Sequence, residues 1–282
     1  MNLSMITPPP HQDVLEIVAL ALREDLGSGD ISAQLIPDAI QARGRVISRD
    51  SAIFCGTVWA NEVLQQVNQA IEVQWLKSDG DEIEVGDELA ILSGPARDLL
   101  SAERCMLNFL QTLSATATLS HKLAKLVSHT KVKLLDTRKT LPGLRVAQKF
   151  AVAVGGCHNH RKGLYDGYLV KENHISACGS IPEAILRARA LQPQLPVEVE
   201  VQNLAQLEIA LQAGADIVML DNFDLDTVKQ AVAFNHGRAK LEASGGVDEE
   251  NLVLLAETGV DLISIGALTK NCKAVDLSLL FE

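Results

Sequence analysis

The second half of the chain repeats one pattern, in which an apolar strand-like run is followed by a stretch of helical spacing. The runs are Val132 to Leu135, Gly167 to Val170, Val197 to Val201, Ile217 to Leu220, Lys240 to Ala243 and Leu262 to Ile265. The last four end at a spacing of 21, 23 and 22 residues, counted between Glu200, Asp221, Ser244 and Gly266. Repeating β-α units of this length imply parallel strands with right-handed helical crossovers. We therefore predict an α/β fold with a TIM-like barrel, complete or incomplete, and keep a doubly wound open sheet as the alternative.

Each of these runs is followed on its C-terminal side by residues that can bind a ligand or do chemistry. They are Arg138 and Lys139, Lys171 to Asn173, Glu200, Asp221 and Asn222, Ser244 to Gly246, and Gly266. Active sites of α/β barrels lie on this face, in the loops that follow the strands. We expect these groups to converge on one pocket.

Two local patterns refine this expectation. In Val197 to Val201, period-two alternation puts two glutamates on one face and the valines on the other, and helices outside the barrel would leave the glutamates pointing inward. We expect a functional role for Glu200 at the strand end, and an ion-pair role for Glu198 one layer deeper. The glycine-containing turns Ser244 to Gly246 and Gly266 to Ala267 follow the last two strands, where such folds commonly hold a phosphate.

Positive charge is concentrated in residues 131–174, where nine Lys and Arg accompany three acids, although the chain has a net charge of -11. This segment carries +6 and the rest of the chain -17. Such a concentration suits a small polyanion better than a nucleic acid, which needs a basic face over the whole domain. We expect Lys131, Lys133, Lys149 and Lys162 to be solvated surface charges, and the ligand to carry carboxylates or phosphates.

The overall composition limits the class of protein. With 282 residues and 47% hydrophobic content, the chain can form one large domain or two medium ones. No apolar run approaches the roughly eighteen uncharged residues of a membrane span, and Met1 to Asp13 lacks a signal-peptide pattern, so we expect a cytoplasmic protein. The five scattered cysteines favour reduced thiols over disulfides or a zinc site. A pI near 5.1 and 4% aromatic content disfavour nucleic-acid binding.

Three motifs lie among the cations: DTRKTLPG from Asp136 to Gly143, GGCHNHRKGL from Gly155 to Leu164, and KENHI from Lys171 to Ile175. These motifs resemble the quinolinate phosphoribosyltransferase family, the carboxylating nicotinate-nucleotide pyrophosphorylases. The likeness covers nearly the whole chain, and its other parts are LREDLGSGDIS from Leu22, ERCMLN from Glu103 and SIGALT from Ser264. Long motifs in the same order are more specific than any single glycine turn.

The resemblance implies a pentosyltransferase that converts quinolinate and 5-phosphoribosyl 1-pyrophosphate into nicotinate mononucleotide, pyrophosphate and CO₂, in de novo NAD biosynthesis. It implies Mg²⁺ with the phosphoribosyl donor and no organic cofactor. It also implies a homodimer or larger oligomer with shared active sites, because Arg104 in that family reaches into the pocket of a neighbouring subunit. The charge pattern agrees independently, since both substrates carry several negative charges.

The resemblance also implies a role for each candidate residue. The quinolinate carboxylates are expected at Arg138, His160 and Arg161. The pyrophosphate and the substrate are expected at Lys139 and Lys171, with Thr137 in the same substrate site. The ribose hydroxyls, or the magnesium directly or through water, are expected at Glu200 and Asp221. The 5-phosphate is expected at Ser244, Gly245 and Gly246 and at Ile265, Gly266 and Ala267. The expected catalytic residues are Lys139, Lys171, Glu200 and Asp221.

We divide the chain into three parts. Residues 1–112 are expected to form an N-terminal α+β sandwich domain of hammerhead-like type, which serves assembly and contributes to a neighbour's active site. Residues 113–270 are expected to form the catalytic barrel, reached through a long helix from Ala102 to Val127. Residues 271–282 are expected to return to the N-terminal domain.

One position departs from the family pattern, because Cys157 stands where a third glycine is expected before the histidine motif. A β-carbon restricts that turn. We expect a small buried side chain there rather than a catalytic thiol.

Two other functions fit parts of the pattern. The first is an aldolase-like lyase in which Lys171 forms a Schiff base, although Arg138 and Arg161 would then have no use. The second is a non-enzymatic, anion-binding relative associated with molybdate uptake, which shares the fold. The presence of both the Asn159 to Arg161 and the Lys171 to His174 motifs favours the enzyme.

Overall fold

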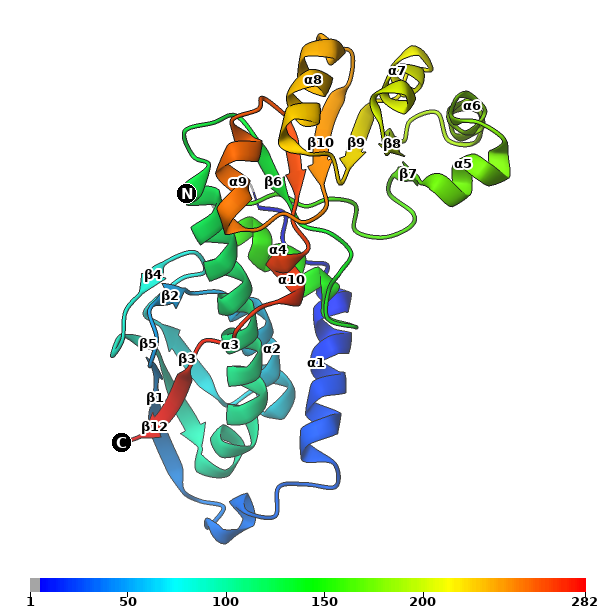
Figure 1. Cartoon of the computed structure of the whole chain (residues 1–282). Helices are drawn as coiled ribbons and strands as arrows, with labels where there is room; N and C mark the ends of the chain where they lie inside the picture. Colours follow the sequence, from blue (N-terminus) through cyan, green and yellow to red (C-terminus); the bar gives the residue numbers. More distant parts are fainter. Residues whose placement is uncertain (1–5) are drawn as a thin grey trace. The chain divides into compact units, whose positions relative to one another are not determined.

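The computed structural model describes residues 6–282, and its contacts divide the chain into two compact units (Figure 1). The first contains the chain up to Lys122 together with Thr140–Gly156 and Leu268–Glu282, and the second contains Leu123–Lys139 and Cys157–Ala267. This division differs from the sequence-based boundaries at three places. Residue 112 lies inside one continuous helix, α3 (Ala96–Leu126), and Thr140–Gly156 groups with the N-terminal part rather than with the parallel strands. The returning C-terminal segment begins at Leu268 and not at residue 271.

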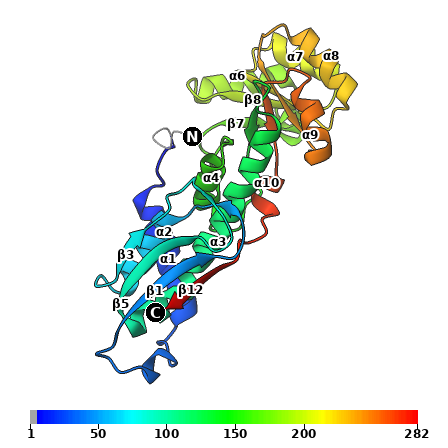
Figure 2. The ribbon, with the colours of Figure 1, turned by 90° about the vertical axis from the view of Figure 1, so that its left-hand side faces the viewer.

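The first unit is built on an antiparallel sheet with the order β12-β1-β5-β3. Its strands are β1 (Gln41–Ser48), β3 (Glu72–Trp75), β5 (Glu88–Pro95) and β12 (Leu277–Phe281), while β2 (Ala52–Ile53) and β4 (Glu82–Ile83) form a separate pair. The helices, besides α3, are α1 (His11–Leu26), the 3₁₀ turn η2 (Ala33–Leu35), α2 (Thr57–Val67), α4 (Arg145–Val154) and α10 (Ala267–Lys270). Because β12 lies beside β1, the end of the chain completes the N-terminal sheet (Figure 2).

Helical periodicity explains how α1 and α4 join this core. In α1 the buried residues Val14, Val18 and Leu22 are four apart and therefore lie on one face. In α4 the buried Ala147 and Ala151 have the same spacing, and both helices belong to one hydrophobic cluster. The segment that follows the DTRKT motif thus packs in the first unit because its apolar face is buried there.

The second unit contains six parallel strands in the order β6-β11-β10-β9-β8-β7. The strands are β6 (Lys133–Leu135), β7 (Tyr168–Val170), β8 (Val197–Val201), β9 (Ile217–Asp221), β10 (Lys240–Ser244) and β11 (Leu262–Ser264). The helices between them are α5 (Glu172–Cys178), α6 (Ile181–Leu191), α7 (Leu204–Gln212), α8 (Leu225–Asn235) and α9 (Glu249–Ala256). All six strands predicted from the repeat are confirmed.

Of the complete and incomplete barrels that the sequence allowed, the structure has the incomplete one. The sheet has free edges at β6 and β7, which are not paired with each other among the described residues. A closed barrel of this type needs about eight strands, and this unit has six. The chain between β6 and β7 adds only a single bridge, Leu135 to His158, and otherwise forms α4 and loops.

Side-chain caps start the helices that follow the central strands. Asn203, Asp224 and Asp248 accept backbone N–H groups at the first turns of α7, α8 and α9. These bonds satisfy donors that a helix start leaves unpaired, and they hold the short loops after β8, β9 and β10 in place. Within residues 6–282, no helix is both long and apolar enough to cross a lipid bilayer.

Candidate active site

The carboxyl ends of the parallel strands surround a cavity of about 580 Å³ in the second unit. It is lined by Thr137, Arg138, Lys139, His160, Arg161, Lys171, Glu200, Asp221, Asn222, Ser244, Gly245 and Gly246, with Leu169, Met219 and Ser264. The strand ends therefore converge as the sequence pattern predicted. The reason is geometric, because parallel strands place all of their carboxyl ends at one edge of the sheet.

The other predicted residues lie outside this lining. Ile265 is buried after β11, and Ala267 begins α10. Gly266 lies directly against Lys139, since a β-carbon on it would come within 3.0 Å of the Lys139 Cδ atom. Arg104 belongs to α3 in the first unit, where 57% of its side chain is exposed. The ligand roles expected for these residues stay predictions.

Asp136, buried at the end of β6, organises the loop that carries the histidine motif. Its Oδ1 accepts the backbone N–H of His160 at 2.9 Å, and its Oδ2 accepts Nδ2 of Asn159 at 2.7 Å. A buried carboxylate is stable when such donors satisfy it. Neither Asp136 nor Asn159 was among the predicted site residues, although an acid directly after an apolar strand was a usable signal.

The cavity holds two guanidinium groups close enough to affect each other. Burial, and next the positive charge of Arg138, lower the pKa of Arg161, while the carboxylates of Glu198 and Asp166 act in the opposite direction. Arg161 also donates from Nη1 to the carbonyl oxygen of Gly167 at 3.3 Å. Two neighbouring guanidinium groups are an arrangement that a ligand with two negative groups would stabilise.

Lys171 and Glu200 meet across the mouth of the sheet between β7 and β8. The Lys171 Nζ atom lies 2.5 Å from Oε2 of Glu200, whose side chain is 14% exposed. Lys171 is also the N-cap residue of α5, and its backbone N–H donates to Nδ1 of His174 at 3.0 Å. The helix start and the ion pair therefore hold the ammonium group at the edge of the cavity.

Two buried glutamates, Glu198 and Glu242, lie deeper in the sheet than the cavity residues at the strand ends. Glu198 in β8 is 5% exposed, and its Oε2 lies 3.0 Å from Nε2 of His160, so the partner of this deeper glutamate is an imidazole ring. Glu242 in β10 is fully buried, with Oε2 3.6 Å from the same nitrogen. The sequence reasoning missed Glu242. Period-two alternation was the available signal, because Glu242 lies two residues before the cavity residue Ser244, as Glu198 does before Glu200.

The turn after β10 is held in an unusual backbone conformation. Gly245 has φ +99°, and Asn222 after β9 has φ 56°. The N–H of Asn222 donates to the carbonyl oxygen of Ser244 at 2.9 Å, so the two strand ends are linked. A β-carbon on Gly245 would lie 2.1 Å from Oδ1 of Asn222, which means that only glycine fits without displacing that side chain.

Gly245→Ala is therefore expected to raise the KM for a phosphorylated substrate about tenfold and to lower the melting temperature by several degrees. Gly214→Ala is the matched control, because Gly214 also has positive φ (+80°) but has open space around its α-carbon and lies outside the cavity. Steady-state kinetics and thermal unfolding of both variants check this. An equal effect of the two substitutions on KM would contradict the proposed clash with Asn222.

Cys157 occupies the predicted small buried position. Its side chain is 3% exposed, and burial, with the nearby charge of Asp136, raises the pKa of the thiol to about 12. The positive φ in this turn belongs to Gly156, at 97°, and not to Cys157. The β-carbon is therefore tolerated without strain, and a thiol with so high a pKa is a poor nucleophile at neutral pH.

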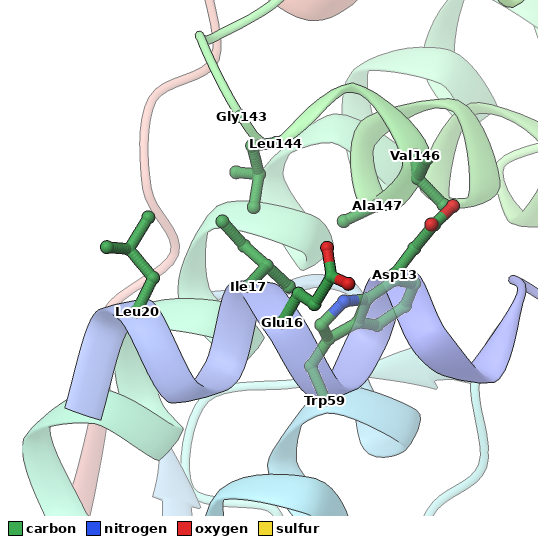
Figure 3. Close-up of a pocket in the computed structure, with 9 residues that line it drawn as sticks. All are labelled: Asp13, Glu16, Ile17, Leu20, Trp59, Gly143, Leu144, Val146 and Ala147. Carbon is green, nitrogen blue, oxygen red and sulfur yellow. The ribbon is translucent and has the colours of Figure 1, made fainter. Parts of the chain in front are cut away.

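The first unit has a cavity of its own, between α1, Trp59 and the start of α4 (Figure 3). Its volume is about 360 Å³ and its lining is mainly apolar, including Ile17, Leu20 and Leu144. The charged residues in this lining are Asp13 and Glu16. Two acids would repel an anion, so this cavity does not suit the ligand that the cations of the second unit favour.

Comparison with known proteins decides the family. The model of the N-terminal domain of quinolinate phosphoribosyl transferase matches residues 30–114, and the model of its C-terminal domain matches residues 116–280. The chain belongs to the quinolinate phosphoribosyltransferase family. A probable carboxylating nicotinate-nucleotide pyrophosphorylase of Bacillus subtilis is 41% identical over 270 residues, which cover 95% of this chain and 93% of the relative. The Mycobacterium leprae enzyme of the same name is 40% identical, over 94% and 95% of the two chains.

Solved structures agree with membership of the quinolinate phosphoribosyltransferase family. The nicotinate-nucleotide pyrophosphorylase of Francisella tularensis superposes with a TM-score of 0.95 at 48% identity, covering 98% of this chain and 99% of that one. A Pyrococcus furiosus protein of the same name, at 14% identity and a TM-score of 0.71, shows the shared fold alone. The resemblance read from the motifs is confirmed, as is the α/β fold class with an incomplete barrel.

Proposed function

We propose that this chain transfers the phosphoribosyl group of 5-phosphoribosyl 1-pyrophosphate to quinolinate with loss of CO₂, giving nicotinate mononucleotide and pyrophosphate for NAD biosynthesis. The observation that carries the proposal is the composition of one cavity. Arg138 and Arg161 offer charge for two carboxylates, the turn at Gly245 offers backbone N–H groups for a phosphate, and Glu200 and Asp221 offer carboxylates for a ribose.

The residues of the cavity support each step of this reaction. The pyridine nitrogen forms a bond to the anomeric carbon while the bond from that carbon to pyrophosphate breaks, and the carboxylates of Glu200 and Asp221 stabilise positive charge on the ribose. Lys139 and Lys171 stabilise negative charge on the leaving pyrophosphate. The 2-carboxylate then leaves as CO₂, the cationic ring accepts the electron pair at carbon 2, and a proton replaces the carboxylate there. The arginines orient the ring throughout.

The donor set suits magnesium bound together with the phosphoribosyl donor. Mg²⁺ is commonly held by one or two carboxylates and by substrate phosphates, and Glu200 and Asp221 are the carboxylates that face this cavity. Glu200 and Asp221 would hold the ion directly or through water. When bound, the ion would supply charge neutralisation at the pyrophosphate. The proposal includes no organic cofactor.

The two alternative functions are less well supported. A Schiff-base lysine needs an amine that is free to attack a carbonyl group, whereas the Nζ atom of Lys171 contacts Oε2 of Glu200. The molybdate-associated relative shares the fold and parts of the motifs, but the relatives that match most of this chain are carboxylating pyrophosphorylases.

Release of labelled CO₂ from carboxyl-labelled quinolinate tests the proposal directly. We expect release only when protein, phosphoribosyl pyrophosphate and Mg²⁺ are all present, with nicotinate mononucleotide formed in equal amount. A folded protein that releases no label under these conditions would refute the proposed function. Titration with molybdate would then test the anion-binding alternative.

Quinolinate should be preferred over nicotinate by at least about 100-fold in kcat/KM. Nicotinate lacks the second carboxylate, so one or two guanidinium groups would be desolvated without a partner, which costs roughly 2–3 kcal/mol. Competition between the two substrates, followed by chromatography of the products, measures the ratio. Comparable turnover of nicotinate would show that the arginines do not recognise two carboxylates.

We also propose a cytoplasmic homodimer or larger oligomer with shared active sites and with neither nucleic-acid nor membrane partners. The exposed side chain of Arg104 supports this, because it is available to complete the pocket of another subunit. Arg104→Ala and Lys171→Ala should each be inactive alone and regain activity when mixed, since a mixed dimer has one intact site. Mixing two samples of the same variant is the control, and no recovery in the mixed sample would argue against shared sites.

A further inference from the structure

His160 uses both ring nitrogens inside the protein. Its Nδ1 accepts the backbone N–H of Arg161 at 2.7 Å, and its Nε2 lies 3.0 Å from Oε2 of Glu198. A backbone N–H can only donate, so Nδ1 carries no proton and the ring proton is on Nε2. The ring is therefore neutral and donates to Glu198. It holds the backbone at Arg161 and has no ring N–H directed at a ligand.

The acceptor of this bond belongs to a buried pair of carboxyl groups. Glu198 and Glu242 come from β8 and β10. One carboxylate oxygen of each and the Nε2 atom of His160 all lie within 4.8 Å of one another. Both oxygens of Glu242 and Oε1 of Glu198 are buried without a hydrogen bond of good geometry. Two ionised carboxylates so close together and so deeply buried would be strongly unfavourable.

A protonated Glu242 resolves this conflict. Burial, and next the charge of Glu198, raise the pKa of Glu242 well above the usual range for a carboxyl group. At neutral pH Glu242 is then an acid that can donate to Glu198. Glu198 becomes the common acceptor of two donors, the Glu242 hydroxyl and the His160 ring.

The position of these residues connects them to the candidate active site. His160 and Arg161 line the substrate cavity and also a second, deeper cavity of about 250 Å³, whose walls include Glu198 and Glu242. The pair of acids thus lies behind the ring of His160, on the side away from the strand ends. On the other side of the loop, Asp136 holds the backbone N–H of His160.

We propose that Glu198 and Glu242 are positioning residues, which form a buried support that orients Arg161 in the substrate cavity through the ring of His160. This inference rests on the proposed function, because it concerns how the cavity recognises a dicarboxylate. It goes further by giving His160 a supporting role and by giving a role to two acids that do not line the substrate cavity.

Calorimetry of quinolinate and phosphoribosyl pyrophosphate binding to folded variants tests whether the two buried acids orient Arg161. Glu198→Leu removes the acceptor and leaves the His160 N–H unsatisfied, so we expect the Kd for quinolinate to rise about 30-fold. The Kd for phosphoribosyl pyrophosphate should stay within about threefold of wild type, which a general loss of structure would not allow. Glu198→Gln restores an acceptor and should recover most of the quinolinate affinity.

Glu242→Gln is the matched variant for the second acid. An amide copies the shape and the donor of a protonated carboxyl group, so its Kd for quinolinate should stay within about threefold of wild type. The side chains of His160, Glu198 and Glu242 could instead hold a metal ion, since they form the one cluster of three potential metal ligands found among the described residues. A metal site would make Glu242→Gln as damaging as Glu198→Leu and would make quinolinate binding sensitive to a chelator. Either result would overturn the proposal.

Nitrogen NMR of the wild-type protein provides a test that needs neither a buried substitution nor enzymatic activity. The ring signals of His160, assigned by their loss in His160→Asn, should show one protonated and one unprotonated nitrogen at neutral pH. Two protonated nitrogens would exclude the bond from Arg161 and overturn the proposal. If the tautomer is as expected but wild-type protein binds no quinolinate, the proposed function fails while the buried support stands.

Discussion

Arg138→Ala is expected to lower kcat/KM for quinolinate by about 100- to 1,000-fold. Removing one guanidinium leaves a carboxylate of the bound substrate without its partner, and such losses cost roughly 2–5 kcal/mol when the group left behind is desolvated. The effect should appear mainly in the KM for quinolinate, because Arg138 faces the cavity at the end of β6 and is expected to bind quinolinate. Initial rates at varied quinolinate and saturating phosphoribosyl pyrophosphate measure it.

Arg187→Ala is the matched control for this prediction. Arg187 lies on α6 with 58% of its side chain exposed, outside the cavity, and it pairs with Glu183 at 2.9 Å on the same helix. Arg187→Ala removes the same charge and the same side chain as Arg138→Ala does. An exposed ion pair of this kind contributes little to stability. Unchanged kinetics in Arg187→Ala with a large loss in Arg138→Ala would locate the effect in the cavity. Similar small changes in both variants would show that Arg138 does not contact quinolinate.

Lys171→Ala is expected to lower kcat/KM for phosphoribosyl pyrophosphate by about 1,000-fold. The substitution removes a cation from the cavity, and it also leaves the Glu200 carboxylate, 2.5 Å from the Lys171 Nζ atom, without its ion-pair partner. An unpaired carboxylate facing a polyanion costs several kcal/mol through like-charge repulsion. Initial rates at varied phosphoribosyl pyrophosphate give the loss.

Two further variants separate these two causes. Lys171→Ala combined with Glu200→Gln removes the repulsion, so calorimetry should show tighter binding of phosphoribosyl pyrophosphate than in Lys171→Ala alone. Lys240→Ala is the matched lysine control, since Lys240 begins β10 and therefore lies at the opposite end of the sheet from the cavity. If the double variant binds no better than the single one, the lysine acts by direct contact only and the repulsion argument fails.

Much of the architecture was predictable because the second unit is made of regular local units. The parallel strands are short runs that contain buried apolar residues, so they are visible in sequence, and the near-constant spacing of the later strand ends identifies the repeat. The sequence left open whether the barrel closes. Whether β6 and β7 pair depends on where the intervening segment packs, and α4 buries its apolar face in the first unit.

The candidate site shows the same division between local and tertiary information. The sequence indicated Arg138, Lys171 and Glu200 because each lies in or after the C-terminal end of a strand, and strand ends of a parallel sheet meet at one edge. It did not indicate Asp136 or Glu242, whose importance comes from bonds and contacts to a loop far away in the chain.

The amino-acid sequence by itself therefore determined the parallel α/β unit, the anionic character of the ligand and, through its motifs, the family. These properties depend on periodicity, charge and residue order, which a linear chain already contains. Only the tertiary structure decided that the sheet stays open and that the Asn222 side chain fills the space beside the α-carbon of Gly245. It also decided that both ring nitrogens of His160 have partners within the protein. Those properties depend on distances between residues that are remote in sequence, and such distances exist only once the chain has packed.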